Sequence, residues 1–458
     1  MHVAQLAPPT YNQVTKHNLP QLQPKIFELL KQAEFIALDA EFTGLGPKRK
    51  ATTATDIQER YHNLCELAKS HALIAFGLSI FIKSVPSGSS LTSTKDTEGA
   101  AKVDEDLERS YLVHNFNFSM LSENDYTVSP NSMIFLAENG LDLNQWILEG
   151  IPYTGGDRLV NEGGRELEAY ACIRLCYFLS FYASLPPKLS TFVADLSDMF
   201  PGGLFDTKYI SDYITRERAS FLAFLFRKYE RYNIRAKDGI EPTAKQVYST
   251  FDVQPRLVLP AVQGNREAVV PATKSGNSLV PYCEGYAFHG VCKMSMRCGL
   301  SHDLDLILDA EEQQQVKKRG KRKRRHGSTD SQGADGGENR ASLEIESSSN
   351  ATEAGNTNQS KDVAPKTNGQ GLLDMPPIAT VAPPAENVLQ PGEKFHSAYF
   401  DAFMTGAVFS HQMDQHRPDD IEAQARNKLY LIGKSIPLMI EKSAFAKFSP
   451  EHERLRTL

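Results

Sequence analysis

Cysteine is scarce in this sequence of 458 residues, and its distribution excludes a disulfide-stapled secreted protein. Of the six cysteines, Cys65, Cys172 and Cys176 lie in apolar segments, and the other three are clustered between residues 283 and 298. Disulfide frameworks belong to oxidising compartments, whereas a small cysteine cluster in a reducing compartment is typical of a metal site. The pattern therefore favours an intracellular protein with one cysteine-rich metal site.

The sequence also lacks long apolar runs and a net positive charge. No run reaches membrane-spanning length and the N-terminus has no charged-then-apolar signal pattern, so we expect a soluble protein without a membrane partner. The net charge is −6 at pH 7, which means that any binding of nucleic acid must be local. A hydrophobic content of 41% supports a sizeable core, while a mean hydropathy of −0.38 indicates some polar, unfolded sequence.

The chain is organised around residues 35–42, an apolar run that carries two acids. Asp39 and Glu41 are two positions apart, and side chains with this spacing point to the same face of a strand. Two adjacent carboxylates repel each other unless a cation lies between them, and Mg²⁺ prefers oxygen ligands of this kind. Taken alone, the run fits an edge strand with two solvated acids equally well.

Hydrophobic periodicity predicts strands followed by helices. The expected strands are 35–42, 72–83 and 111–118, and the expected helices are 20–33, 56–65, 132–149, 166–183 and 214–232. This order indicates an α/β fold, a mixed sheet flanked by helices.

Composition divides the chain into a core interrupted by an insertion. We expect a core in two parts, 1–255 and 391–458, because the second part is too short to fold alone and contains a hairpin near 428–438. Between the two parts we expect a zinc finger at 276–305 and a disordered linker at 306–390, which is rich in Ser, Asn, Gly, Glu and Pro.

The most specific motif has the spacing Cys-x8-Cys-x5-Cys-x3-His, formed by Cys283, Cys292, Cys298 and His302. Three thiolates and one imidazole complete a tetrahedral Zn²⁺ shell, and a closed shell of this kind is structural rather than catalytic. The spacing resembles that of the CCCH zinc fingers, many of which bind single-stranded RNA.

Aromatic and basic residues stand among these ligands: Tyr286, Phe288, Lys293 and Arg297. Aromatic faces stack on unpaired bases and cations meet phosphates, so we expect this module to bind single-stranded RNA. A purely structural or protein-binding finger is the alternative.

A basic run follows the finger. Eight of its nine residues are cations: Lys317, Lys318, Arg319, Lys321, Arg322, Lys323, Arg324 and Arg325. Such a run repels itself, stays extended and suits nuclear import or electrostatic RNA binding. We therefore expect a nuclear protein with an import receptor as partner, the alternative being a solvated linker.

A third acid stands in residues 395–406. His396 precedes an apolar helical stretch that carries one acid, Asp401, and a buried acid is costly unless it is paired or bound to a metal. A His at the entrance of the helix can take a proton from water near neutral pH. A capping His and a surface Asp are the plainer interpretation, but beside Asp39 and Glu41 they are the parts of a two-metal phosphodiesterase.

Residues 38–42, Leu-Asp-Ala-Glu-Phe, and the spacing from His396 to Asp401 resemble the first and last motifs of the DEDDh 3′–5′ exoribonucleases. Within that family the chain is similar to the poly(A)-specific deadenylases. Further segments fit the same family: 59–61, 76–78, 182–186, 206–209 and 427–434.

The resemblance implies an RNase H-like fold and dependence on Mg²⁺ or Mn²⁺. It implies that Asp39, Glu41 and Asp401 ligate the metals and that His396 activates the attacking water. It also implies a nuclear protein of Cajal bodies and nuclear speckles that trims 3′ oligo(A) tails of single-stranded RNA, including small nuclear RNA precursors.

One motif of the family is missing from the sequence. The family has a strand with a His-Asn-Gly-x-x-Asp motif before its Phe-Tyr-x-x-Leu-Pro segment, which stands here at 181–186, and the Asp of that motif holds the second metal. Residues 169–194 contain no carboxylate, and Asp195 and Asp206 lie downstream of the required place. Two alternatives therefore stay open: an impaired RNA-binding scaffold of the same fold, and a CCCH transcriptional or splicing regulator in which the acids are incidental.

Overall fold

The computed structural model describes one compact unit, built from residues 1–312 and 391–458. A second unit, 313–390, lies outside the described residues except for Gln313. The described residues are 9–46, 54–84, 109–153, 185–237, 249–253, 282–294, 297–313, 397–415 and 418–456.

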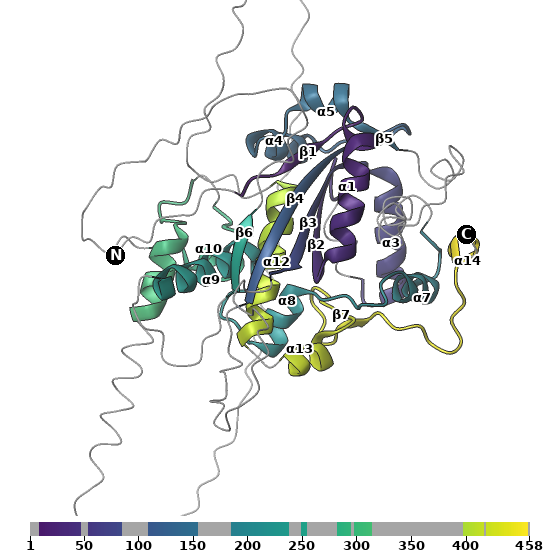
Figure 1. Ribbon diagram of the computed structural model, residues 1–458. Coiled ribbons are helices and arrows are strands. Elements are labelled where there is room, and N and C mark those ends of the chain that lie inside the picture. Colours follow the sequence, from purple (N-terminus) through teal and green to yellow (C-terminus); the bar gives the residue numbers. More distant parts are fainter. Residues whose placement is uncertain are drawn as a thin grey trace, which may run out of the picture. The chain divides into compact units, whose positions relative to one another are not determined.

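The centre of the unit is a six-stranded mixed sheet (Figure 1). Its strands are β1 (Asn12–Val14), β2 (Phe35–Phe42), β3 (Leu73–Lys83), β4 (Arg109–Ser122), β5 (Ile151–Tyr153) and β6 (Ser249–Val253). β2, β3 and β4 are antiparallel neighbours, while β6, β1 and β5 pair in parallel with successive parts of β4. In the described part of the chain β2 pairs with β3 alone, so β2 is an edge strand there.

Helices surround this sheet. They are α1 (Leu19–Gln32), α3 (Ile57–Ser70), α4 (Pro130–Glu138), α5 (Leu143–Glu149), α7 (Leu189–Met199), α8 (Thr207–Tyr209), the π-helical turn η1 (Ile210–Ile214), α9 (Leu222–Lys237), α10 (Glu284–His289), α12 (Ala398–Gln415), α13 (Pro418–Ala425) and α14 (Pro450–Arg456). A two-stranded hairpin pairs β7 (Lys428–Leu429) with β8 (Leu438–Met439). Among the described helices, none is long and apolar enough to cross a membrane.

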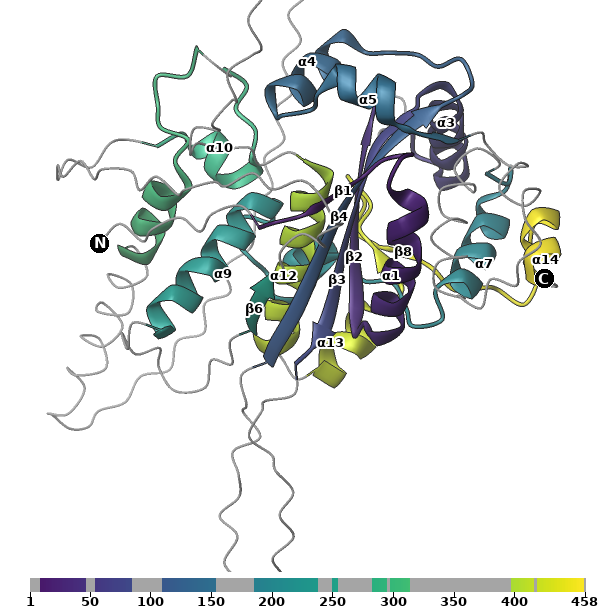
Figure 2. The same ribbon diagram turned by 45° about the horizontal axis from the view of Figure 1, so that its top comes forward.

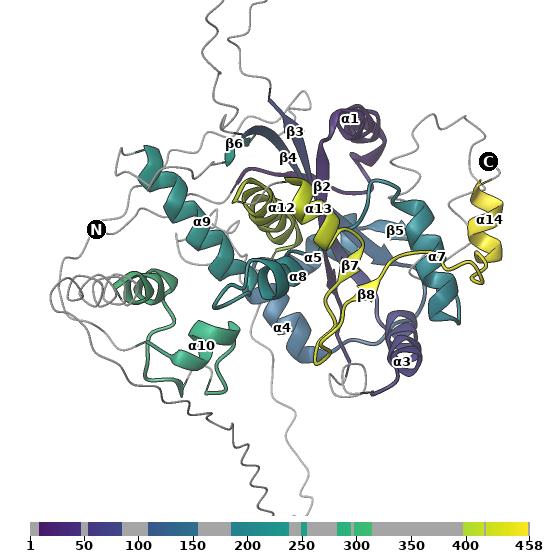
Figure 3. The ribbon, with the colours of Figure 1, turned by 90° about the horizontal axis from the view of Figure 1, so that it is seen from below.

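The two faces of the sheet carry separate cores. Leu38 and Ala40 of β2 pack against the cluster that holds Ile26 and Leu30 of α1. Ala37 of β2 packs on the opposite side, in the cluster that contains α12. Figure 3 shows α1 and α12 on opposite sides of the sheet. The alternation predicted for residues 35–42 is therefore confirmed: one face of β2 is apolar, and the other carries the acids.

The prediction of a mixed sheet flanked by helices is confirmed, and β2 has the predicted bounds. The predicted helix 132–149 is wrong as a single helix, because Gly140 has a φ of 99° and separates α4 from α5. The predicted helix 214–232 begins later, as α9, after the π-helical turn. The predicted helix 166–183 lies outside the described residues.

The segment predicted to be a zinc finger packs on α9 of the core (Figure 2). Ala287 of α10 and Ile307 share a buried cluster with Phe224 and Leu225 of α9, and Val408 of α12 belongs to the same cluster. Residues 304–313 are helical, which corrects the prediction that a disordered linker begins at residue 306. The reason is local: Leu304, Ile307 and Leu308 recur at helical spacing and are buried against α9.

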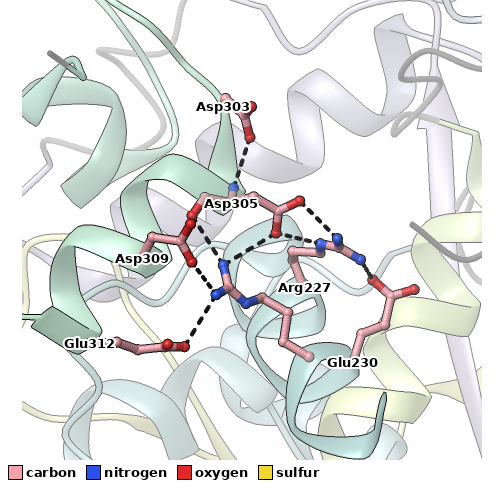
Figure 4. Close-up of polar contacts among 7 residues, drawn as sticks. Arg227, Glu230, Asp303, Asp305, Asp309 and Glu312 are labelled. Atoms are coloured by element: carbon pink, nitrogen blue, oxygen red, sulfur yellow. Dashed lines mark hydrogen bonds and ion pairs between the residues drawn. The ribbon is translucent and has the colours of Figure 1, made fainter. Parts of the chain in front are cut away.

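An ion-pair network reinforces this contact (Figure 4). Nε and Nη2 of Arg227 donate to the two carboxylate oxygens of Asp305 at 2.9 and 2.8 Å, and Nη1 donates to Glu230. Arg231 donates to the Asp305 carbonyl at 3.0 Å and to the carboxylate of Asp309. Both arginine side chains are no more than 4% exposed, so these charges depend on their partners.

Removing the Asp305 carboxylate should lower the free energy of unfolding. An Asp305→Ala variant leaves Arg227 buried without its bidentate acceptor, which should cost about 3 kcal/mol. Equilibrium unfolding in urea measures the loss. Glu28→Ala is the control, because it removes an exposed pair with Lys31 and should change stability by less than about 0.5 kcal/mol. Equal effects of the two substitutions would show that the network does not hold residues 304–313 against α9.

Candidate metal centre

Three carboxylates meet where β2 lies beside the first turn of α12. Asp39 and Glu41 project from the same face of β2, and Asp401 belongs to the first turn of the helix. One carboxylate oxygen from each residue lies within 4.8 Å of the other two. The structure thus brings together all the predicted acidic ligands that it describes. His396, the predicted base, lies just outside the described residues.

A glycine in β3 allows this meeting. Gly77 is the register partner of Asp39, and a Cβ on Gly77 would lie 1.9 Å from the carbonyl oxygen of Ala398 in α12. Any larger residue would push the start of α12 away from the sheet. The backbone N–H of Asp401 donates to the Ser397 carbonyl at 3.0 Å, which fixes Asp401 within that first turn. Sequence reasoning included Gly77 in a family segment but missed this role, although an isolated glycine within a strand is a signal of close backbone approach.

The three acids strongly affect one another's charge. Burial, and then the neighbouring Asp401 and Glu41 carboxylates, raise the pKa of Asp39 from 3.8 to about 8. Carboxyl groups this close to one another are all ionised only when a cation compensates their charges. An oxygen-only donor set of three carboxylates fits a hard divalent cation such as Mg²⁺ or Mn²⁺.

The two downstream acids have structural roles. Asp195 is fully buried and accepts the backbone N–H of Ser449 at 3.0 Å. Asp206 caps α8 by accepting the N–H of Lys208, and it also accepts the N–H of Tyr430 at 2.7 Å. Neither acid belongs to the carboxylate group formed by Asp39, Glu41 and Asp401.

The predicted zinc ligands form a second, separate group. One ligand atom from each of Cys283, Cys292, Cys298 and His302 lies within 4.8 Å of the others. Nε2 of His302 is buried and makes no hydrogen bond, and the backbone N–H of Tyr286 donates to the Cys283 sulfur at 3.5 Å. A buried imidazole nitrogen without a hydrogen bond beside three thiols fits a tetrahedral Zn²⁺ site.

The thiols of this group interact strongly. Burial acts to raise the pKa of the Cys292 thiol, but hydrogen bonds from the Met294 backbone and from the Cys298 and Cys283 thiols outweigh it and lower the pKa to about 7. A lowered pKa favours the thiolate, which is the form that binds metal.

The predicted RNA contacts have different surroundings. Tyr286 is half-buried and stacks on the His302 ring, with ring centroids 4.5 Å apart, so Tyr286 packs inside the finger. Phe288, Lys293 and Arg297 are exposed. The basic run 317–325 lies outside the described residues. Of the four predicted RNA contacts, Tyr286 therefore has the least surface to offer.

A Gly77→Ala substitution should separate Asp401 from Asp39. The added methyl group would overlap the Ala398 carbonyl, so α12 must shift, and overpacking of this kind costs about 1–3 kcal/mol. We expect Mn²⁺ binding, measured by electron paramagnetic resonance, to weaken at least tenfold. Gly202→Ala is the matched control and should keep Mn²⁺ affinity, because a Cβ on Gly202 would meet no atom within 4 Å. Unchanged Mn²⁺ affinity in Gly77→Ala would contradict the close-approach argument.

Folding stability without a divalent cation should fall as pH rises from about 4 to about 8. The folded-state pKa of Asp39 lies above its unfolded value of 3.8, so the folded protein retains a proton that the unfolded chain releases in this window. Urea unfolding at several pH values measures the trend, with Mg²⁺ expected to offset it near pH 8. Asp39→Asn should flatten it, and an equally steep trend in that variant would assign it to other groups.

Comparisons with known proteins agree with this geometry. The CAF1 family ribonuclease model matches residues 14–168 and 174–409, which is more than half of the chain. The poly(A)-specific ribonuclease PARN of Xenopus laevis is 26% identical over 153 residues, which are 31% of this chain and 21% of that protein. PARN of Homo sapiens is 28% identical over 153 residues, with the same coverage of both chains. The chain thus matches about a fifth of the length of these curated relatives.

Solved structures give weaker likenesses. The Mg²⁺- and Mn²⁺-bound form of S. pombe Pop2p has a TM-score of 0.32 and 18% identity, over 49% of this chain and 82% of that one. Yeast CAF1, co-crystallised with the NOT1 MIF4G domain, gives a TM-score of 0.28 and 15% identity, over 53% and 84%. These scores are too low to carry an argument. The family match includes β2 and the part of α12 that carries Asp401, and it covers more than half of the chain: the chain belongs to the CAF1 family ribonucleases.

Proposed function

We propose that this protein is a metal-dependent 3′–5′ exoribonuclease that shortens 3′ oligo(A) tails. The observation that carries the proposal is the meeting of Asp39, Glu41 and Asp401 in a chain of the CAF1 family ribonucleases. The similarity to poly(A)-specific ribonucleases supports oligo(A) as the substrate.

The three carboxylates and His396 would have different roles, which follow from their positions. Asp39, Glu41 and Asp401 would hold the cation, and the raised pKa of Asp39 means that binding displaces a proton from its carboxyl group. Mg²⁺ or Mn²⁺ bound there would stabilise the charge that develops on the phosphate oxygens during in-line displacement. His396, which precedes α12, would take the proton from the attacking water.

The further parts of the chain support a nuclear protein of the CCCH-finger type, similar to the Target of EGR protein. The Cys283, Cys292, Cys298 and His302 group would hold Zn²⁺ and keep the finger folded. The basic run 317–325 would bind a nuclear import receptor, with residence in Cajal bodies and nuclear speckles. Small nuclear RNA precursors with 3′ oligo(A) tails are the substrates that we propose.

A second candidate function is an RNA-binding protein with impaired catalysis. The motif that should supply the second metal ligand is absent, and the family match is interrupted at residues 169–173, just where that motif is expected. Loss of one ligand from a cooperative two-metal site should slow the reaction on the order of 10³-fold or more. This candidate keeps the RNA-binding surfaces and loses most of the turnover.

An assay with a 5′-labelled RNA that ends in oligo(A) tests the proposal. The purified full chain should shorten it stepwise from the 3′ end and release AMP with Mg²⁺ or Mn²⁺, but not with Ca²⁺. Asp401→Asn should reduce the rate at least 10³-fold, because it removes a ligand charge. Asp56→Asn is the matched control, since Asp56 caps α3 and Asn caps helices equally well.

The same assay separates the two candidates. If the chain binds the RNA without shortening it, while a version with an inserted His-Asn-Gly-x-x-Asp segment shortens it, the impaired RNA-binding protein is the correct function. Shortening that continues unchanged in Asp401→Asn would contradict both candidates.

A further inference from the structure

An irregular loop, residues 215–221, joins the π-helical turn η1 to α9. It begins directly after η1, and Arg216 within it has a φ of 51°. A π-helical turn and a left-handed residue other than glycine are both sparsely populated conformations, and both are concentrated at functional sites. The two unusual conformations lie within seven residues of each other, which indicates that the shape of this loop serves a function beyond joining η1 to α9.

The backbone of this loop turns one side chain inward and two outward. Glu217 points into the core, where its carboxylate accepts from Lys228 Nζ at 2.6 Å and from the Tyr229 hydroxyl at 3.2 Å. Arg216 and Arg218, on either side of it, are exposed. Arg216 makes no ion pair with any other residue that the structure describes. A strained backbone therefore presents a cation that serves no internal contact.

Arg218 connects this loop to the zinc finger. Its guanidinium lies 4.5 Å from the centre of the Phe288 ring, and it pairs with Glu311 at 3.0 Å. The finger is close to the end of the loop as well, because a Cβ on Gly290 would lie 2.7 Å from the Phe221 ring. Phe288 is 39% exposed, so the loop and the finger share one surface on which an aromatic ring lies beside the Arg218 cation, and Arg216 stands two residues before Arg218 in the same loop.

The same loop is tied to the carboxylate group through α9. Leu222 and Phe226 of α9 pack in the cluster that contains Phe400 and Phe403, which stand on either side of Asp401 in α12. The buried network of Arg227 and Asp305 fixes the finger segment to α9 from the other side. The surface of Arg216, Arg218 and Phe288 therefore cannot move independently of the helix that carries Asp401.

We propose that Arg216, Arg218 and Phe288 form a contact site for single-stranded RNA upstream of the 3′ end that enters the carboxylate group. The guanidinium groups would contact phosphates, and the Phe288 face would stack on a base. Stacking requires an unpaired base, which is why the site fits single strands rather than duplexes. This site rests on the proposed function for its substrate, but its binding can be measured without catalysis.

Binding in the zinc-loaded Asp401→Asn protein, which does not consume the RNA, tests the site. Fluorescence anisotropy is measured with labelled oligo(A) of about 20 nucleotides over a series of salt concentrations. Arg216→Ala should weaken binding and reduce the slope of log affinity against log salt by about 0.7, the share of one phosphate contact. Arg216→Lys should retain the slope. Phe288→Ala should weaken binding about tenfold without a change in slope.

Lys25→Ala is the matched control, because Lys25 is an exposed cation on α1, on the other side of the sheet. Equal affinity and slope in Arg216→Ala and Lys25→Ala would overturn the site, and so would duplex RNA competing as well as oligo(A). Failure of the nuclease assay would leave these binding results intact, so the two proposals are distinguishable.

Discussion

The contact between the first turn of α12 and the backbone of β3 at Gly77 determines the rest of the site. It places Asp401 beside Asp39 and Glu41, which come from the opposite end of the sequence. The ionised state of three carboxylates this close is unfavourable without a cation. Burial and mutual repulsion work against the charged state, and the packing of α12 on the sheet holds the three groups together in spite of it. Repulsion among the carboxylates therefore lowers the stability of the fold and at the same time creates a site for a cation. Like charges commonly converge in this way at functional sites.

The cysteine-rich segment is a part of the core rather than a separate module. Its helix 304–313 is buried against α9, and α9 is buried against α12, so one continuous apolar layer reaches from the cysteine group to the carboxylate group. The bidentate pair of Arg227 and Asp305 fixes the orientation of helix 304–313 on α9, because such a pair tolerates little displacement. An RNA bound as proposed at this segment would therefore be held at a fixed distance from the acids.

Sequence reasoning succeeded where the signal was local. The alternation of residues 35–42 gives β2 and the shared face of Asp39 and Glu41, and the ligand spacing gives the cysteine group. It failed where the cause lies in a distant partner. Residues 306–313 are polar on one face and resemble the linker that follows, but the partner that orders them is α9. The role of Gly77 likewise depends on a helix that the sequence presents hundreds of positions later.

The acids of the carboxylate group come from two parts of the chain that an insertion separates. The polypeptide leaves the compact unit after Glu312 and re-enters it at Pro391, so Asp39 and Asp401 lie on opposite sides of an insertion. The entropy of closing such a loop grows only logarithmically, by about 0.6 kcal/mol for each doubling of its length. A proteolytic cut in the insertion would therefore leave two fragments that complement each other. The acids would come from different polypeptides, held together by the packing of α12 and by the contacts of Tyr430 with Asp206 and of Ser449 with Asp195.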